Sequence, residues 1–233
     1  MILGIDTSSS LTSAAVIDGE RIVGYAEHDD PRRHGEVLAV LLERVLADCG
    51  RAPIDLIACG VGPGPYTGLR VGIATAVALG LAWQVPVHGT CSLDARAAAM
   101  ASSSPTDFVL ATDARRHEVY WAQYAPDGTR LDGPFVGRAQ AIDQAIREWP
   151  WSGEGAALAV PAVAFTGDAT RPTAVDVARL VQRLVNQGEP VGPAVDARAP
   201  HGTDDGRTAA RLAGHRLLPP LPLYVRRPDA MGG

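Results

Sequence analysis

The sequence predicts an α/β protein of two lobes, each a mixed sheet flanked by helices. Segments with the pattern of strands alternate with segments with the pattern of helices, and the order strand, turn, strand, helix occurs twice. The segment 102–106 (SSSPT) has the composition of a linker and separates the two occurrences. We therefore expect a first lobe over residues 1–101, a smaller and degenerate second lobe over 107–218, and a C-terminal tail over 219–233 that its prolines keep extended.

The first lobe is expected to begin with a three-stranded meander, in which Asp18-Gly19 makes the second turn. Two long helices follow. The first has apolar residues at spacings of one, three and four, and the second is apolar around most of its circumference. The expected strands are 2–5, 14–17, 21–27, 54–61 and 86–89, and the expected helices are 33–49, 67–83 and 93–101.

The second lobe has weaker patterns. We expect a hairpin, a turn at Asp127-Gly128, a break at Gly153 to Gly155, and a polar stretch over 190–214 that Gly and Pro interrupt. The expected strands are 108–112, 118–124 and 162–166, and the expected helices are 139–149 and 175–185.

Composition narrows the class of protein. A hydrophobic fraction of 46% and a charged fraction of 20% are typical of a folded soluble domain. The three cysteines are an odd number without a CxxC pair, which indicates free thiols in a reducing cytoplasm. The N-terminus lacks the pattern of a signal peptide, and the longest apolar stretch, 73–83, is about half the ~20 residues that span a bilayer, so cytoplasmic localisation without a membrane is expected. A net charge of −5 argues against a large direct surface for nucleic acid.

A polar turn, Asp6 to Ser10, follows the first strand. Its hydroxyls, backbone N–H groups and carboxylate could hold a phosphate or a metal-bound water, although the same residue types are common in ordinary hairpin turns. A Gly-Ile-Asp-Thr-Ser start, a meander and then helix, strand, helix is the order of an actin-like ATPase (ASKHA, RNase H-like) half-domain. In that fold Asp113 would face Asp6 across the cleft between the lobes. Asp6, Thr7, Ser8 and Asp113 are therefore candidate contacts for a weakly bound nucleotide.

The segment Gly62 to Gly72, GPGPYTGLRVG, carries the most specific pattern. Its glycines and prolines predict a tight turn, and Thr67 is placed to cap the helix that follows. A stripe of small residues on that helix would allow another helix or the protein's own sheet to approach closely. A P-loop is excluded because no Gly-Lys-Ser/Thr follows, and a dinucleotide-binding turn is excluded because the first strand does not lead into this segment. The small residues are Gly68, Gly72, Ala76 and Gly80.

GPGPYTGLRVG is similar to the GPGSFTGLRIG signature of the TsaB (YeaZ) family, relatives of TsaD and of peptidase M22-type proteins. GIDTSSSLTSAAVID, RRHGEVLAVLLERVL, ATDARRHEVYWAQY and PLYVRRPDA resemble segments of that family in the same order. The resemblance implies an ASKHA-like fold and a non-catalytic scaffold that activates synthesis of N6-threonylcarbamoyladenosine (t6A) at position 37 of tRNA. It implies binding to a TsaD-like catalytic paralogue and, with it, a TsaE-like ATPase, a homodimer when alone, indirect contact with tRNA and no resident cofactor.

In that family the partners associate through two first-lobe helices, which here begin near His34 and Thr67. A wide apolar stripe on the first helix and the small residues on the second agree with a role in partner binding. The candidate interface residues are His34, Val37, Leu38, Leu41, Leu42, Val45, Thr67, Gly68, Leu69, Val71, Gly72 and Thr75.

Neither a metal site nor catalytic residues are expected. The catalytic paralogue carries His-x-x-x-His, whereas His88 here is followed at the fourth position by Ser92, and no two histidines are four apart. The rival functions are an M22-like glycopeptidase or hydrolase, and a small ATPase or sugar kinase of the same fold. A hydrolase could use Asp113 or Glu118 as the base and His117 as the proton shuttle, but a charged hairpin turn explains these residues more simply because no local nucleophile motif accompanies them.

Overall fold

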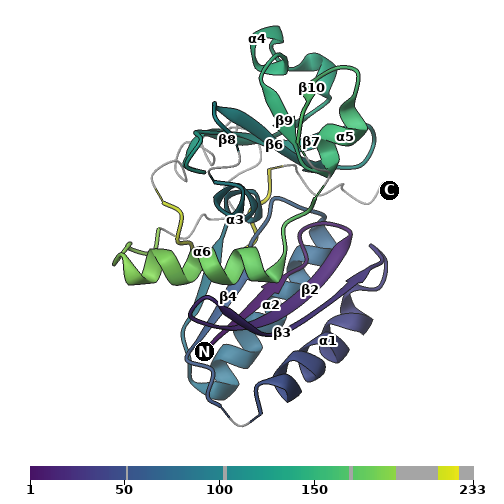
Figure 1. Cartoon of the computed structure of the whole chain (residues 1–233). Helices are drawn as coiled ribbons and strands as arrows, with labels where there is room; N and C mark the ends of the chain where they lie inside the picture. The colour runs from purple at the N-terminus through teal and green to yellow at the C-terminus, as the bar shows by residue number, and fades with distance from the viewer. Residues whose placement is uncertain (51, 102–103, 168–169, 193–214, 226–233) are drawn as a thin grey trace, which may run out of the picture.

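The computed structural model describes residues 1–50, 52–101, 104–167, 170–192 and 215–225, which form two lobes (Figure 1). The first lobe contains a five-stranded sheet in the order β3-β2-β1-β4-β5. β1 pairs antiparallel with β2, with Ile2 opposite Ile17, and parallel with β4, with Ile2 opposite Leu56. The strands are β1 (Ile2–Asp6), β2 (Leu11–Asp18), β3 (Arg21–Asp29), β4 (Leu56–Gly60) and β5 (Val87–Thr90).

The second sheet repeats the topology of the first. Its order is β10-β9-β6-β7-β8, an antiparallel meander to which two parallel strands are added beside the first strand of the meander. The strands are β6 (Phe108–Asp113), β7 (Val119–Tyr124), β8 (Arg130–Gly137), β9 (Pro150–Ser152) and β10 (Ala164–Phe165). Together with the two-lobed arrangement, this confirms the predicted ASKHA-like class of mixed sheets flanked by helices.

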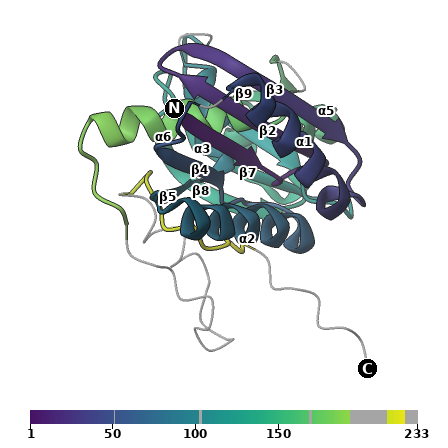
Figure 2. The ribbon, with the colours of Figure 1, turned by 90° about the horizontal axis from the view of Figure 1, so that it is seen from below.

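Helices cover both faces of the first sheet. α1 (His34–Asp48) and α2 (Tyr66–Trp83) lie on one face, and α3 (Ser92–Ala99) and α6 (Ala174–Asn186) lie on the other (Figure 2). β1 shows the alternation of faces, because Leu3 and Ile5 join the core under α1 and α2, whereas Gly4 faces α6 so closely that an added Cβ would lie 2.2 Å from the Ala174 oxygen.

The expected boundary of the second lobe at residue 218 differs from the structure. The predicted helix at 175–185 forms as α6, but it returns to the first lobe and packs on β1, β2, β4 and α3. A capping box between Thr173 and Asp176 starts α6, and its apolar stripe fills a core with Ile17 and Leu56. Leu218, the last residue expected in the second lobe, pairs with Gly89 of β5, and the backbone N–H of Leu223 in the tail donates to the Val61 oxygen at 2.8 Å, so this part of the tail also packs on the first lobe.

One other expectation for the second lobe is wrong, and the structure adds elements that were not expected. The helix expected at 139–149 is a short 3-10 turn, η1 (Ala139–Ala141), followed by α4 (Gln144–Arg147). β8 and β9 were not expected, and the break at Gly153 is followed at once by a short helix, α5 (Glu154–Ala159). Residues 102–103, most of the stretch 190–214 and the last residues of the tail, 226–233, lie outside the described part of the chain.

Two ion-pair clusters tie the lobes together. The Arg171 guanidinium lies 2.7 Å from Asp29 at the end of β3 and 3.6 Å from Glu154 at the start of α5. On the other side of the molecule the buried carboxylate of Asp94 in α3 lies 3.5 Å from the guanidinium of Arg130 in β8 and accepts a 2.8 Å hydrogen bond from the Tyr124 hydroxyl. Both clusters join an element of the first lobe to one of the second.

Candidate functional site

The β1–β2 turn, the candidate nucleotide site, is closed to solvent. Asp6 and Thr7 are 0% exposed and Ser8 is 3% exposed. One oxygen of the Asp6 carboxylate accepts hydrogen bonds from the Ser8 backbone N–H (2.9 Å) and the Ser8 hydroxyl (2.8 Å), and the other accepts one from the Ser92 hydroxyl (2.7 Å). Both carboxylate oxygens of Asp6 therefore have hydrogen-bond partners within the protein.

The Gly62–Gly72 segment closes this turn. The Thr7 hydroxyl donates to the Gly68 carbonyl at 2.8 Å. A Cβ at Gly64 would lie 2.2 Å from the Ser8 oxygen, one at Gly68 would lie 2.6 Å from the Thr7 oxygen, and one at Gly72 would lie 2.3 Å from the Thr7 hydroxyl. The small residues thus serve the protein's own turn, which corrects their interpretation as a partner-binding stripe.

In this structure Asp6, Thr7 and Ser8 are buried and Gly64 packs on the Ser8 backbone, and their role as nucleotide contacts stays a prediction. Burial raises the pKa of Asp6 to about 6, and the hydrogen bonds from Ser8 and Ser92 oppose that rise only in part. Ionising the Asp6 carboxyl group therefore costs more free energy in the folded protein than in water.

Asp6 is buried, whereas Asp113 lies at the end of β6. Its carboxylate accepts a 2.7 Å hydrogen bond from the Arg115 backbone N–H and lies 3.3 Å from the Arg115 guanidinium. These contacts belong to the tight turn between β6 and β7. The charged hairpin turn expected for the segment 113–118 is therefore present, and Asp113 is held by its own turn.

Most of the candidate interface residues point into the protein. His34 is 4% exposed, and its Nδ1 lies 2.6 Å from the Thr12 hydroxyl while its Nε2 faces Gly68. Burial lowers the pKa of His34, which favours the neutral ring. The residues of the predicted interface that are buried are His34, Leu38, Leu41, Leu42, Val45, Gly68, Leu69 and Gly72.

The wide stripe on α1 therefore covers β2 and β3 of its own sheet, which corrects its assignment to a partner. Four predicted residues do reach the surface: Thr67 is exposed, and Val37, Val71 and Thr75 are half-buried.

α2 lies at the outside of the first lobe (Figure 2). Apart from Arg70 and Trp83, its exposed side chains are small or aliphatic. Arg70 is the only charged residue of this helix, and it is engaged at the first turn, where its guanidinium lies 3.9 Å from the centre of the Tyr66 ring and its Nε donates to the Tyr224 hydroxyl. Leu81 is 77% exposed near the other end. The outward positions follow spacings of four and three, as on a helix that packs lengthwise against another: Thr67, Ala74, Ala78 and Leu81, which are exposed, and Val71, which is half-buried.

By length and composition α2 is the one described helix that could cross a membrane. Its inner face packs on β4, β1 and β5, so the apolar side chains on that side belong to the core of the first lobe. The outer face still presents apolar side chains to solvent, which is typical of an interaction surface.

Sequence reasoning did not identify Ala74, Ala78 and Leu81 as surface residues, although their spacing is visible in the sequence. It also missed Arg171, for which no sequence signal exists. Among the described residues, no group of three or more His, Cys, Asp or Glu side chains is placed to hold a metal ion. Ser92, at the place of the paralogue's second histidine, donates to Asp6.

Comparisons with known proteins agree with this geometry. The family model of TsaD, the tRNA N6-adenosine threonylcarbamoyltransferase, matches residues 28–183. An uncharacterised protein of Mycobacterium tuberculosis is 36% identical over 98% of this chain and 93% of its own length. The tRNA threonylcarbamoyladenosine biosynthesis protein TsaB of Escherichia coli is 34% identical over 54% of this chain and 55% of its own length.

Solved structures give the same result. YeaZ from Pseudomonas aeruginosa superimposes with a TM-score of 0.68 at 26% identity, over 81% of this chain and 93% of that one. A second structure, described as similar to peptidase YeaZ from the same organism, has a TM-score of 0.70 over 97% of this chain and 99% of that one. The chain therefore belongs to the TsaB (YeaZ) family, within the wider family that the TsaD model describes.

Proposed function

We propose that this chain is a non-catalytic subunit in the synthesis of t6A in tRNA. In this role it binds a TsaD-like catalytic paralogue in the cytoplasm, and a TsaE-like ATPase joins the pair. Relatives named for threonylcarbamoyladenosine biosynthesis support the pathway. The net charge of −5 supports indirect contact with tRNA, because phosphate binding depends on clustered cations.

The closed β1–β2 turn supports a role without catalysis and without a resident cofactor. In an ATPase of this class a phosphate would have to reach Asp6, Thr7 or Ser8, which are at most 3% exposed and lie under Gly64. Binding a partner protein through the surface does not require a ligand to reach these buried residues. This argument disfavours the small ATPase, and the salt-linked turn at Asp113 disfavours the hydrolase.

The observation that carries the proposal is the outward face of α2. It extends over the whole helix with a single charge at one end, and an apolar surface of this kind loses its contact with water when a partner helix covers it. Val40 of α1, 62% exposed, lies on the outward side of the neighbouring helix. We propose that the paralogue binds across these two outward faces, and that a second copy of the chain occupies them when the paralogue is absent.

We expect Leu81→Glu to abolish co-purification with the TsaD-like paralogue. Burying one uncompensated carboxylate in an interface costs several kcal/mol, so the affinity should fall by at least about a hundredfold. Because Leu81 is 77% exposed in the isolated chain, the thermal unfolding midpoint should stay within about 2 °C of wild type. Affinity is measured by titrating the labelled paralogue, and folding by calorimetry.

The matched control is Leu131→Glu. Leu131 is 49% exposed on β8 of the second lobe, so the same change in chemistry occurs away from α2 and should leave binding intact. Wild-type affinity of the Leu81→Glu variant would refute the assigned surface. Leu41→Glu or Leu42→Glu cannot serve as the test, because these side chains are 8% and 6% exposed and a carboxylate there would unfold the subunit itself.

A further inference from the structure

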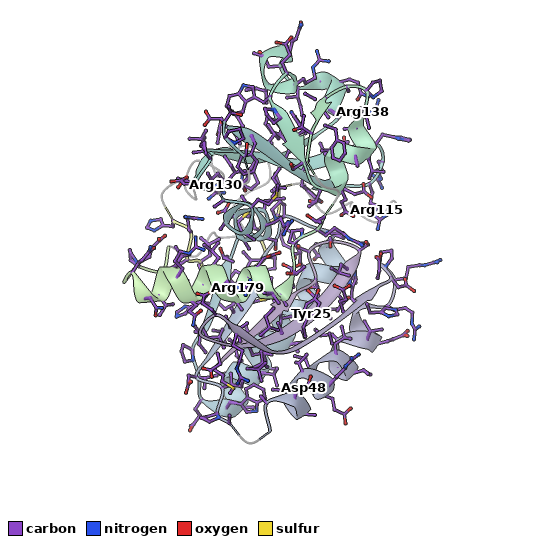
Figure 3. The ribbon with its side chains drawn as sticks, in the orientation of Figure 1. Tyr25, Asp48, Arg115, Arg130, Arg138 and Arg179 are labelled. Carbon is purple, nitrogen blue, oxygen red and sulfur yellow. The ribbon has the colours of Figure 1, made fainter. Side chains whose placement is uncertain are left out.

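A cavity of about 320 Å³ lies beside the β6–β7 turn, where the turn, η1 and α5 meet. It belongs to the second lobe and lies apart from the face of α2 that carries the proposed function. Figure 3 shows Arg115, which lines it, at the edge of the second lobe that is nearer the first lobe. Its volume is at the lower end of the range for small-molecule sites, so a compact ligand fits it better than a peptide.

The inner wall of the cavity is apolar and fixed. Val119, Ala139 and Ala159 line it and are at most 8% exposed, because they belong to the core of the second sheet. Leu158 also lines the cavity but is 67% exposed. A ligand with a short aliphatic part would cover Leu158 and remove apolar surface from water.

The rim of the cavity carries charges of both signs. Arg115, Arg116 and His117 are exposed on it, and the carboxylates of Asp113 and Glu118 lie half-buried beside them. A phosphate would meet two carboxylates there, and a simple cation would meet an arginine. A small zwitterion satisfies both signs, because its anionic end can approach the arginines while its ammonium group approaches the carboxylates.

The backbone of the turn is in an unusual conformation. Arg115, Arg116 and His117 all have positive φ values, of 63°, 56° and 61°, which residues with side chains adopt only at a cost. Two 3.0 Å hydrogen bonds close the turn, from the Glu118 N–H to the Arg115 oxygen and from the Ala114 N–H to the Glu118 oxygen. Glycine would form this turn without backbone strain. The turn instead keeps three residues with polar or charged side chains at the rim, at a cost in conformational free energy, and such strain is common at functional sites.

We propose that this cavity binds a free α-amino acid with a small aliphatic side chain. The ligand's carboxylate lies against Arg115 and His117, its ammonium group against Asp113 and Glu118, and its side chain against Leu158 and Val119. Binding opens the 3.3 Å contact between Arg115 and Asp113 and gives each partner an opposite charge from the ligand. This site is independent of the proposed function, which depends on a different lobe.

The proposal is tested by titrating the isotope-labelled full chain with L-valine and following the backbone amide resonances. We expect saturable shifts at His117, Val119 and Ala159 with a dissociation constant in the millimolar range. Valinamide, which lacks the carboxylate, and 3-methylbutanoate, which lacks the ammonium group, should each bind about tenfold more weakly, since each loses one charge-assisted contact. Inorganic phosphate should not compete.

Variants distinguish binding in this cavity from unspecific electrostatic attraction of valine to the protein surface. Arg115→Gln and Asp113→Asn should each weaken valine binding about tenfold. Arg138→Gln, on the same side of the lobe but outside the lining, should leave it unchanged (Figure 3). The proposal is overturned if valine gives no saturable shift, if phosphate binds in its place, or if Arg138→Gln weakens binding as much as Arg115→Gln. None of these results would affect co-purification with the paralogue.

Discussion

Gly68→Ala is expected to destabilise the protein by about 3 kcal/mol, a value typical of an overpacked core in which backbone must move. The new Cβ would lie 2.6 Å from the Thr7 backbone oxygen and 3.2 Å from His34 Nε2, two buried atoms that have no free space to occupy. The loss should appear as a lower urea midpoint at an unchanged slope, because the unfolded chain exposes the same surface.

Gly35→Ala is the matched control for this variant. Gly35 also lies in a helix, and the nearest atom to its added Cβ, in Val71, is 4.0 Å away. Alanine should therefore stabilise α1 by about 0.5–1 kcal/mol through helix propensity alone. If Gly68→Ala behaved like Gly35→Ala, the account of α2 closing the β1–β2 turn would be wrong.

Asp6→Asn is expected to stabilise the protein at neutral pH and to change how stability depends on pH. The pKa of Asp6 is raised from 3.8 to about 6 by burial, so its contribution to stability is fully present below pH 3.8 and is lost as pH rises through about 6. The difference corresponds to about 3 kcal/mol at pH 8. The asparagine amide can keep the contacts with Ser8 and Ser92 without a charge. Urea unfolding of both proteins between pH 4 and pH 8 measures the difference.

Asp29→Asn should show the opposite sign. The hydrogen bond from Arg171 holds the pKa of Asp29 below its ordinary value, so its carboxylate contributes stability above that value and loses the contribution as pH falls. The variant should be less stable than wild type at neutral pH and equal to it in acid. A constant gap between wild type and Asp6→Asn across the pH range would show that Asp6 has the same pKa in the folded and unfolded protein, which would contradict the raised pKa.

The sequence was sufficient to predict most of the first lobe, because its strands are short apolar runs and its helices have clear periodicity. It also predicted the tight turn at Gly62 and the row of small residues on the next helix. It could not decide what those residues approach, since close contact with Thr7 and close contact with another protein require the same small side chains. The structure decides the question through Gly64 and Gly68, which lie against backbone atoms of the β1–β2 turn.

The second lobe was harder to predict for physical reasons. β8 contains Asp132, Gly133 and Pro134, which interrupt the alternation that marks a strand. α6 has a clear apolar stripe and a capping box, but periodicity does not tell which of two sheets a helix will cover. The return of α6 to the first sheet brings Arg171 to Asp29, a contact between residues that are far apart in the sequence.

The candidate surface was partly visible in the sequence. The family resemblance indicates the correct two helices, but the strongest apolar residues, Leu38, Leu42 and Val45, lie in the core of the subunit. The weaker row that begins at Thr67 and ends at Leu81 is on the surface instead. Buried residues are the most hydrophobic ones on both helices. Hydrophobicity alone therefore ranks them ahead of the surface residues of α2 as interface candidates.

The most direct test of the central claim is reconstitution of tRNA modification with purified components. The chain, the TsaD-like paralogue, the TsaE-like ATPase, tRNA and threonylcarbamoyl-adenylate are combined, and t6A is measured by mass spectrometry of the digested tRNA. We predict product only when the chain and the paralogue are both present, none with Leu81→Glu and the wild-type amount with Leu131→Glu. Product formed by the chain without the paralogue, or an undiminished yield with Leu81→Glu, would contradict a partner-binding role of α2.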